Sequence, residues 1–454
     1  MVFDEHSDAD TIAAPATAIG GGVAIIRLSG PDAVSIVQDR FRRPGVASAL
    51  VPNELVYGTL HDGSGQPLDD CIVVVMQRPH SFTGEDIAEI HCHGGQAVVA
   101  AVLDTCITAG ARLAEPGEFS RRAFLNGKMD LAQAEALGDL IAAQTELSRR
   151  SALRQLRGGL SLEVRNIRDS LLDSAAEIEA HLDFPEEDIP ALAQDRISAA
   201  MTTSREEISR LLDGYQRGRL VREGARVVLA GAPNAGKSSL FNAMIGRERA
   251  IVSPHPGTTR DTIEATIDMC GVPVTLIDTA GLRNSSDEIE RIGVVRTTEE
   301  MMNAELVLLV VDIAGHTESD FADIKLFESG TPVMTVFNKV DQANACSHDP
   351  GENGVRVSAK TKEGLGQLID AISGRLIGSN AQMDATVTRA RHAECLRLAD
   401  DSLQKAEEAF GAAASGDLVM VDLRDAIIHL GEVLGERLDE QILDRIFATF
   451  CLGK

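Results

Sequence analysis

A glycine-rich segment between two apolar runs carries the clearest chemical signature of this sequence. Gly231-Ala-Pro-Asn-Ala-Gly-Lys-Ser238 follows the strand-like residues 226–230 and precedes a helix-like run that begins at Ser239. A glycine loop between a strand and a helix directs backbone N–H groups at a phosphate. We therefore expect the Lys237 ammonium to reach the outer phosphates of a nucleotide, and the Ser238 hydroxyl to ligate Mg²⁺.

Two further motifs are expected beside the same phosphates. Asp278-Thr-Ala-Gly281 follows the apolar run 272–277, and it would bring a carboxylate to the Mg²⁺ shell and a glycine N–H to the γ-phosphate. Between it and the glycine loop lies Gly257-Thr-Thr-Arg-Asp261, in which a threonine would complete the magnesium sphere. The spacing thus predicts a magnesium-bound nucleoside triphosphate.

Two later motifs predict which base is bound. Asn338-Lys-Val-Asp341 follows the strand-like run 332–337, and Ser358-Ala-Lys360 comes next in the chain. The Asp341 carboxylate can accept the N1–H and the 2-amino hydrogens of guanine, neither of which adenine offers. A backbone N–H of the Ser358 motif would donate to guanine O6. Five motifs in this order predict a GTP-binding domain. The residues expected to contact GTP are Asn234, Ala235, Gly236, Lys237, Ser238, Ser239, Ser253, Pro254, His255, Pro256, Gly257, Thr258, Thr259, Asp278, Thr279, Ala280, Gly281, Asn338, Lys339, Asp341, Ser358, Ala359 and Lys360.

The hydrolytic step has to use an unusual set of groups. Leu282 follows Gly281, where Ras-like enzymes carry the glutamine that orients the attacking water, so another group in residues 284–291 must do so. The sequence identifies no arginine finger. Asn234 has two interpretations: it ligates a monovalent cation, together with backbone carbonyls of 253–258, in place of a finger, or it stabilises the loop.

Composition limits the class of protein. The 454 residues suffice for two to four domains, and the formal charge of −26 argues against holding nucleic acid by bulk attraction. Seven scattered cysteines without C-x-x-C spacing are typical of reduced thiols in a cytosol. The acidic start lacks a signal-peptide core, and the strongest apolar run, 306–311, is too short to cross a bilayer. We expect a cytoplasmic protein without membrane insertion.

The elements that must position these motifs change in type along the chain. Residues 1–125 mix strand-like runs with turns, which indicates an α+β domain. Helical periodicity dominates 126–222 and returns in 379–454, whereas strands and helices alternate in 223–378 and predict a parallel sheet. We predict a multi-domain α/β protein in which a helical domain is interrupted by an inserted nucleotide-binding domain.

Short motifs outside the nucleotide segment extend to both ends of the chain. They include Asp10-Thr-Ile-Ala-Ala14, Ser81-Phe-Thr-Gly-Glu-Asp86, Pro116-Gly-Glu-Phe-Ser120, Ile289-Glu-Arg-Ile-Gly293 and the C-terminal Ile446-Phe-Ala-Thr-Phe-Cys-Leu-Gly-Lys454. With them the whole sequence resembles the MnmE or TrmE family of tRNA-modification GTPases. The tail departs from the family only at Leu452, where isoleucine is usual, and this apolar exchange changes little.

The resemblance implies a fold and an activity. It implies an N-terminal α+β domain for folate binding and dimerisation, a discontinuous all-α helical domain and an inserted Ras-like P-loop GTPase (G) domain. It also implies a homodimer that binds a tetrahydrofolate derivative, 5-formyl- or 5,10-methylene-tetrahydrofolate. With an FAD- and NADH-dependent partner, MnmG or GidA, in a heterotetramer or larger complex, it would install an aminomethyl-type group, such as carboxymethylaminomethyl, at C5 of the wobble uridine of certain tRNAs. GTP hydrolysis would be stimulated by K⁺.

The resemblance also assigns roles to residues. For hydrolysis it implies Asn234, Lys237 and a water-orienting Glu290. The implied magnesium ligands are Ser238 and Thr259, and the implied potassium site comprises Asn234, Ser253, His255 and Thr258. The implied folate residues are Arg27, Glu89, Lys128 and Lys454.

The chemistry of a folate suits these last residues. The amino-pyrimidinone edge of a pterin, like that of guanine, can be read by a carboxylate such as Glu89, and the anionic glutamyl tail suits Arg27 or lysines. Taken alone, each would be interpreted as a surface charge. Cys451 has two readings, a catalytic thiol or a thiol that merely packs.

Two other features leave alternatives open. Arg150, Arg154, Arg157 and Arg168 fall near one helical face, with Arg121 and Arg122 nearby, and this set indicates either contact with RNA phosphates or a solvated, salt-bridged face. Gly158-Gly159 would break the helix between them. His91-Cys92-His93 indicates a metal site or ordinary packing, because adjacent strand residues point to opposite faces.

The competing functions are a ribosome-assembly GTPase of the Era or Der type, and a stand-alone folate-dependent transferase with a regulatory GTPase. A basic RNA-binding appendage would favour the ribosomal role, but the helical, acidic C-terminal region offers none. A requirement for a partner in wobble-uridine modification would exclude the stand-alone transferase.

Overall fold

The computed structural model describes most of the chain. The described residues are 10–43, 50–183, 191–248, 263–279, 300–313, 331–342, 354–378, 386–412, 415–437, 439–450 and 453. They form two compact units, one made of residues 1–138 and 431–454 and the other of residues 139–430.

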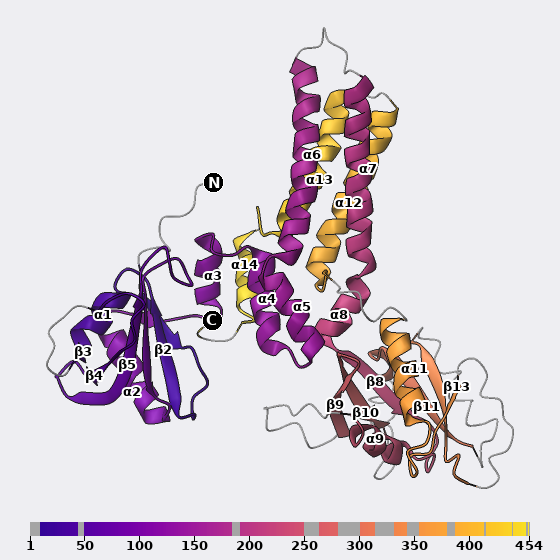
Figure 1. The fold of residues 1–454 in the computed structure, drawn as a ribbon, viewed down its shortest axis with the longest axis horizontal. Helices are drawn as coiled ribbons and strands as arrows, with labels where there is room; N and C mark the ends of the chain where they lie inside the picture. Colours follow the sequence, from indigo (N-terminus) through magenta and orange to yellow (C-terminus); the bar gives the residue numbers. More distant parts are fainter. Residues whose placement is uncertain are drawn as a thin grey trace. The chain divides into compact units, whose positions relative to one another are not determined.

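The first unit is built on a seven-stranded sheet with the order β3-β4-β5-β6-β2-β1-β7 (Figure 1). Neighbouring strands are antiparallel except for β1 and β7, which are parallel. The strand-like runs expected from sequence within residues 1–125 are confirmed. The strands are β1 (Ile12–Pro15), β2 (Val23–Ser29), β3 (Phe41–Arg42), β4 (Val56–His61), β5 (Pro67–Met76), β6 (Ile87–His93) and β7 (Arg112–Leu113).

Two helices cover one face of this sheet. Buried side chains of α1 (Ala33–Arg40) and α2 (Gln96–Thr108) join those of β2, β5 and β6 in one aliphatic core. The other face carries exposed apolar side chains. Tyr57 of β4 and Ile72 of β5 are cross-strand neighbours there, and they are 62% and 39% exposed. Alternation along the strands thus gives a buried face and an open, partly apolar face.

Three more helices complete the first unit around an aromatic cluster. In α3 (Glu118–Leu125), α4 (Leu131–Ala142, which continues into the second unit) and α14 (Glu440–Phe447), apolar side chains meet across a long sequence separation. Leu131 and Phe447 are buried there, and the Leu131 N–H donates to the carbonyl of Leu434. Helix α14 therefore packs against the N-terminal part of the first unit.

Long amphipathic helices dominate the second unit. Buried residues at 160, 164, 167, 171, 175 and 178 repeat at three- and four-residue intervals along α6, as one apolar helix face requires. Helix α7 contacts both α6 and α12, and these helices run alongside α13 (Figure 1). The helices are α5 (Glu146–Leu156), α6 (Gly159–Asp183), α7 (Ala191–Asp213), α8 (Tyr215–Glu223), α12 (Ala390–Gly411) and α13 (Gly416–Val433).

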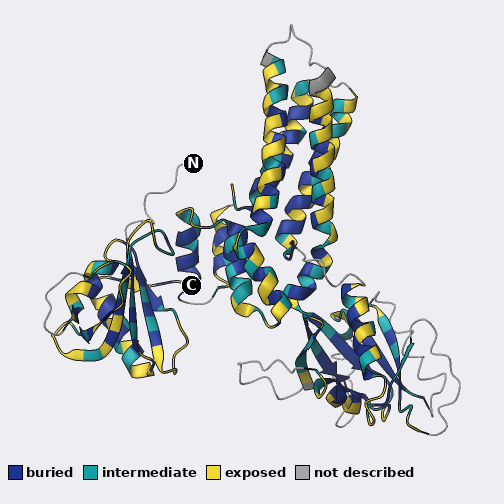
Figure 2. Ribbon diagram, viewed as in Figure 1, coloured by how far each residue is buried: buried dark blue, intermediate teal, exposed yellow. Residues whose placement is uncertain are grey.

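A six-stranded sheet with the order β13-β12-β11-β8-β10-β9 forms the rest of the second unit. Its central strands are buried almost throughout (Figure 2), as continuous apolar runs with helices packed against them should be. The strands are β8 (Ala225–Ala230), β9 (Ile263–Met269), β10 (Val272–Asp278), β11 (Leu306–Asp312), β12 (Val333–Asn338) and β13 (Gly354–Arg356), and the helices are α9 (Lys237–Ile245) and α11 (Leu365–Ile377).

The expectation of a parallel sheet is wrong for one strand. Five strands are parallel, but β9 pairs antiparallel with β10. The cause is the connection, because only Cys270 and Gly271 separate the two strands, and a parallel pair would need a long crossover. Within the described part of the chain, no helix is long and apolar enough to cross a membrane.

Candidate nucleotide and folate sites

The loops that carry the nucleotide motifs leave the sheet at one edge. Leu229, near the end of β8, is in register with Asp278 at the end of β10, and Asp312 of β11 is in register with Asn338 of β12. The carboxyl ends of parallel strands are where an open α/β sheet binds its ligand. The order of strands thus brings together motifs that are more than one hundred residues apart.

Glycine is required at two positions of the glycine loop. Gly231 has φ +138°, and a Cβ there would lie 2.2 Å from the Val310 carbonyl oxygen. Gly236 has φ +93° and is the N-cap of α9, and a Cβ there would lie 2.3 Å from Asn338 Nδ2. Any side chain would therefore push the loop away from the strand or the base-binding segment.

The cationic side chain of the loop is held inside it. Lys237 is buried, and its Nζ donates to the carbonyl oxygens of Gly231 and Ala232 at 2.9 and 3.0 Å. Ser238 lies exposed in the first turn of α9, whose N-terminus carries partial positive charge. Asn234, at φ +65°, is exposed on the loop. This arrangement suits an anionic phosphate.

Buried Asn338 joins the glycine loop to the base-binding loops. Its Nδ2 donates to the carbonyl of Ala235 at 3.0 Å, and its Oδ1 accepts the backbone N–H groups of Lys339 and Ala359 at 2.8 and 3.1 Å. One amide thus satisfies three backbone groups from three loops. Their relative positions are consequently fixed by the protein itself.

The carboxylate expected to read guanine is also held in place. The hydroxyl of buried Ser358 donates to Asp341 Oδ1 at 2.7 Å, and this hydrogen bond lowers the pKa of Asp341 below its ordinary 3.8. Asp341 is therefore ionised at neutral pH. Lys339 Nζ pairs with Asp312 Oδ2 at 2.6 Å.

The magnesium motif is described in part. Asp278 is fully buried at the end of β10, and the hydroxyl of Thr279 donates to the Leu229 carbonyl at 2.8 Å. Hydroxyl and carboxylate oxygens such as those of Ser238 and Asp278 are the hard donors that Mg²⁺ prefers, so the residues fit this ion. The predicted site residues that lie outside the described residues are Ser253, Pro254, His255, Pro256, Gly257, Thr258, Thr259, Ala280, Gly281, Glu290 and Lys454.

Two of the predicted folate residues are in direct contact in the first unit. Arg27 of β2 is in register with Glu89 of β6, and its Nε donates to Glu89 Oε1 at 2.8 Å. The guanidinium carbon lies 5.5 Å from the centre of the Phe82 ring and 5.8 Å from that of Phe119. His91 Nε2 is 3.4 Å from Glu89 Oε2. The Arg27–Glu89 pair therefore has two aromatic rings within cation–π distance of its guanidinium.

Of the other two predicted folate residues, Lys128 lies on a described segment and Lys454 lies outside the described residues. Lys128 Nζ donates to the Pro79 carbonyl at 2.9 Å, at the start of the loop that carries Phe82. The last described residue, Gly453, is so close to the end of β1 that a Cβ would meet Pro15 O at 2.0 Å. Pro15 is in register with Ile26, the residue before Arg27, so Gly453 lies against the strand that neighbours β2.

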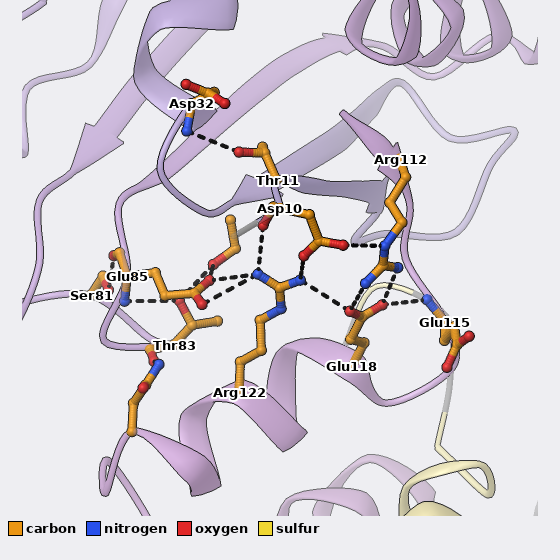
Figure 3. A network of polar contacts seen from close by, with 12 residues as sticks. Asp10, Thr11, Asp32, Ser81, Thr83, Glu85, Arg112, Glu115, Glu118 and Arg122 are labelled. Atoms are coloured by element: carbon orange, nitrogen blue, oxygen red, sulfur yellow. Dashed lines mark hydrogen bonds and ion pairs between the residues drawn. The ribbon is translucent and has the colours of Figure 1, made fainter. Parts of the chain in front are cut away.

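A buried polar network around Arg122 was not predicted from sequence (Figure 3). The Arg122 side chain is 7% exposed and pairs with Asp10, Glu85 and Glu118, while Arg112 also pairs with Asp10 and Glu118. Arg122 Nη1 donates to the Asp10 carbonyl at 3.0 Å as well. The N-terminal segment, the loop before β6 and α3 are thereby tied together.

The same network reaches the folate residues. Ser29, two residues from Arg27, donates to Glu85 Oε2 at 2.7 Å and lies 2.6 Å from the Thr83 hydroxyl. Thr83 follows Phe82, and its carbonyl accepts Asn126 Nδ2 at 2.8 Å. The backbone on both sides of the charged pair therefore depends on the Arg122 network. No local sequence signal marks it, because its members come from segments that are far apart in the chain.

The arginine set does not lie along one continuous helix, and its members differ in exposure. Arg122 is buried in ion pairs, and Arg121 lies 3.5 Å from Asp444. Helix α5 ends at Leu156 and α6 begins at Gly159, with Gly158 at φ +84°, so the expected helix break is confirmed. Arg154 pairs with Glu163 at 3.5 Å, as a salt-bridged surface would.

The His91-Cys92-His93 segment is packed as an ordinary strand, with neighbouring side chains on opposite faces of the sheet. Cys92 is buried, and its Sγ lies 3.5 Å from the Ala24 carbonyl, whereas His93 Nδ1 lies 2.7 Å from Asp69. Burial raises the pKa of Cys92 above 9.0. Among the described residues, no group of three or more His, Cys, Asp or Glu side chains is arranged to hold a metal ion.

Comparison with known proteins decides the family. The family model described as the MnmE helical domain matches residues 131–451, and that of the GTP-binding protein TrmE N-terminus matches residues 11–128. The tRNA modification GTPase MnmE of Symbiobacterium thermophilum is 44% identical and covers 98% of this chain and 99% of its own. Those of Aquifex aeolicus and Chloroflexus aurantiacus are 40% and 45% identical and cover 98% of this chain and 100% of their own. The chain belongs to the MnmE family of tRNA modification GTPases.

Family membership identifies the activity as GTP hydrolysis in tRNA modification, and it favours this role over ribosome assembly. The mixed α/β organisation with a helical domain is also confirmed.

Among solved structures, the G domain of the FeoB iron transporter of T. maritima is 30% identical and covers 33% of this chain and 98% of its own, with a TM-score of 0.27.

Replacing the base-reading carboxylate should change nucleotide preference. Asp341→Asn exchanges two acceptors for a donor and an acceptor, so GTP affinity should fall by roughly tenfold to a hundredfold while xanthosine triphosphate gains affinity. Calorimetric titration with both nucleotides measures this. Glu363→Gln, which alters an exposed acid near the same loop, is the control. Retention of GTP preference by Asp341→Asn would contradict the assignment.

The Arg122 network should make the first unit sensitive to acid. Burial alone would raise the pKa of Glu118, but hydrogen bonds from Arg112, the Glu115 N–H and Arg122 hold it below its ordinary 4.5. A lowered folded-state pKa gives stability that is present above pH 4.5 and is lost as pH falls through the folded value. Hydrogen exchange of the α3 amides, corrected for intrinsic rates, should show weaker protection at pH 4 than at pH 6.

Glu118→Gln should already weaken this protection at pH 6, by about 1–3 kcal/mol, and should show less change on acidification. Glu115→Gln is the matched control, because Glu115 contributes its backbone N–H to the network while its side chain is exposed. Equal protection of α3 at pH 4 and pH 6 in the unmodified chain would contradict the role of the network.

Proposed function

We propose that this chain is a potassium-stimulated GTPase that uses a tetrahydrofolate one-carbon unit to install an aminomethyl-type group at C5 of the wobble uridine of tRNA. It acts in the cytoplasm as a homodimer, with an FAD-dependent partner of the MnmG or GidA type that handles the redox chemistry. Its organisation is an N-terminal folate-binding domain and a helical domain interrupted by the GTPase domain. The observation that carries the folate assignment is the Arg27–Glu89 pair on the neighbouring strands β2 and β6.

The chemistry around this pair supports a reduced folate as ligand. A pterin ring is flat, apolar on its faces and polar along its amino-pyrimidinone edge, so it needs aromatic neighbours and a carboxylate. Phe82, at intermediate exposure, lies against Arg27, and Glu89 supplies two acceptors, while fully buried Phe119 packs on the inner side of Arg27. Lys128 and the terminal Lys454 would attract the anionic glutamyl tail. The residues that the structure describes therefore fit a folate.

The open face of the N-terminal sheet supports dimerisation. Tyr57 and Ile72 are exposed neighbours on β4 and β5, and Val23 of β2 is also exposed. Glu89 and His91 of β6, at intermediate exposure, extend the same face through the register of Ile72 with His91. Burial of this surface against a second copy would remove apolar area from water.

The glycine loop supports a potassium-assisted hydrolysis. No arginine finger is evident in the sequence, so another positive charge must stabilise the transition state. Asn234 presents an exposed amide at a left-handed backbone position on the loop, where its oxygen is available to a monovalent cation. Ser253, His255 and Thr258 would complete that site, and Glu290 would orient the attacking water.

Potassium dependence tests the hydrolytic part. The GTP hydrolysis rate should be about tenfold or more higher in K⁺ than in Na⁺, the scale of losing one transition-state contact. Asn234→Ala should bring the ratio of the two rates close to one. Asn242→Ala, an exposed amide on α9 away from the loop, should leave the ratio unchanged. Equal rates in K⁺ and Na⁺ for the unmodified chain would contradict the cation role.

Folate titration tests the modification part. Glu89→Gln should weaken the binding of 5-formyl-tetrahydrofolate by about tenfold or more, because one carboxylate oxygen that accepts from the pterin edge is replaced by an NH₂ donor. GTP affinity, measured by the same calorimetry, should not change. Asp70→Asn on β5, which contacts Thr59, is the control. Unaltered folate affinity in Glu89→Gln would reject this site, and the GTPase assignment would remain.

A further inference from the structure

The turn between β9 and β10 is docked on the first residues of α5. The Thr145 hydroxyl donates to the carbonyl oxygen of Gly271 at 2.6 Å. Gly271, at φ +90°, lies so close to α5 that a Cβ would be 2.7 Å from Leu147 Cβ. Asp268 Oδ1 accepts the Gly271 N–H at 2.7 Å and fixes the turn. A rigid turn of the nucleotide-binding sheet therefore contacts a helix of the helical region directly.

Thr145 also begins that helix. As N-cap of α5 its hydroxyl accepts the Ser148 backbone N–H, and Ser148 in return accepts the Thr145 N–H, which makes a capping box. The same side chain thus fixes the helix start and the turn contact. Any displacement of Gly271 acts on the group that holds the first turn of α5.

The docked hairpin joins the two motifs that the sequence predicts to lie beside the phosphates and Mg²⁺. Strand β9 begins at Ile263, two residues after the Gly257–Asp261 motif, and β10 ends at Asp278, the first residue of the second phosphate motif. Between them the register is unbroken from Val272–Met269 to Asp278–Ile263. The seven paired residues form a continuous two-stranded ladder with a length of roughly 20 Å. Its far end is the Gly271 turn.

A second contact holds the same end of the hairpin. Gly224, between α8 and β8, packs so tightly on Pro273 of β10 that a Cβ would lie 2.6 Å from its carbonyl oxygen. Glu305 accepts the Arg226 N–H at 2.8 Å and pairs with Arg219 of α8 at 3.4 Å. The turn is consequently held between α5 and the point where α8 enters the sheet.

A cavity lies next to this contact. It has a volume of about 150 Å³ and is lined by α4, α5 and α8 residues that include Ala142, Ser148, Ala152, Gln155 and Val221. Ser148 belongs to the capping box. Close packing resists small shifts, and the side chains of α5 and α8 that line this cavity are less tightly constrained than those of a close-packed core.

We propose that the docking of the Gly271 turn on Thr145 is the coupling contact through which the nucleotide state of the GTPase sheet changes the position and stability of α5. It deepens the family's GTP-dependent tRNA modification and does not depend on the folate site. The two states are the two placements of the β9–β10 hairpin, and α5 is the element that follows them.

Hydrogen exchange of the full chain tests this coupling. Exchange of the α5 amides should differ severalfold between the GDP complex and the complex with a non-hydrolysable GTP analogue. Thr145→Asp should abolish that difference, because aspartate still caps the helix but has no proton to donate to Gly271. Thr145→Ser, which retains the hydroxyl, should preserve it. GTP hydrolysis by Thr145→Asp should stay within about twofold, while tRNA modification in cells lacking the native protein is lost.

Thr275→Val is the matched control, because it removes the Thr266–Thr275 hydroxyl contact of 3.2 Å on the same hairpin and leaves α5 untouched. It should retain the nucleotide-dependent exchange of α5. Identical exchange of α5 in both nucleotide states of the unmodified chain would overturn the proposal, and so would a difference that persists in Thr145→Asp. Absence of GTP hydrolysis in the unmodified chain would instead contradict the family's activity.

Discussion

The buried amide of Asn338 is the interaction on which the nucleotide site depends. It satisfies the Ala235 carbonyl of the glycine loop and two backbone N–H groups of the base-binding loops. A buried amide of this kind is costly to leave unpaired, so the three loops are held in one arrangement. Gly236 must lack a side chain for the same reason, since a Cβ would occupy the space of Asn338 Nδ2. The protein thereby pre-organises phosphate and base recognition together.

In the first unit, ion pairs hold separate segments in one arrangement. Three carboxylates surround two guanidiniums, and Arg122 joins segments that begin at residues 10, 81 and 118. Buried ions are costly unless they are paired and hydrogen-bonded, and here each has several partners. The Arg27–Glu89 pair lies on the backbone that this network holds. The charged pair that we propose to bind folate is thus positioned by charges that need not contact a ligand.

Sequence reasoning succeeded where residue spacing has a local cause. The strands before the nucleotide motifs could be located because buried parallel strands are continuous apolar runs, and the glycines because only glycine fits. It failed for β9, whose direction depends on a two-residue turn, and for Arg122, because burial of an arginine depends on acids from distant motifs. The docking of Gly271 on Thr145 joins residues 126 positions apart and has no local signal. The roles of Glu290, Thr259 and Lys454 stay predictions, because these residues lie outside the described ones.

The most direct test of this account is the affinity of Asn338→Ala for GTP and GDP, measured by calorimetry on the full chain. Loss of the shared amide should weaken the binding of both nucleotides by about 1–3 kcal/mol, or roughly fivefold to 150-fold, because loop order and base contact are lost together. Affinities within about twofold of the unmodified protein would contradict a site pre-organised by Asn338.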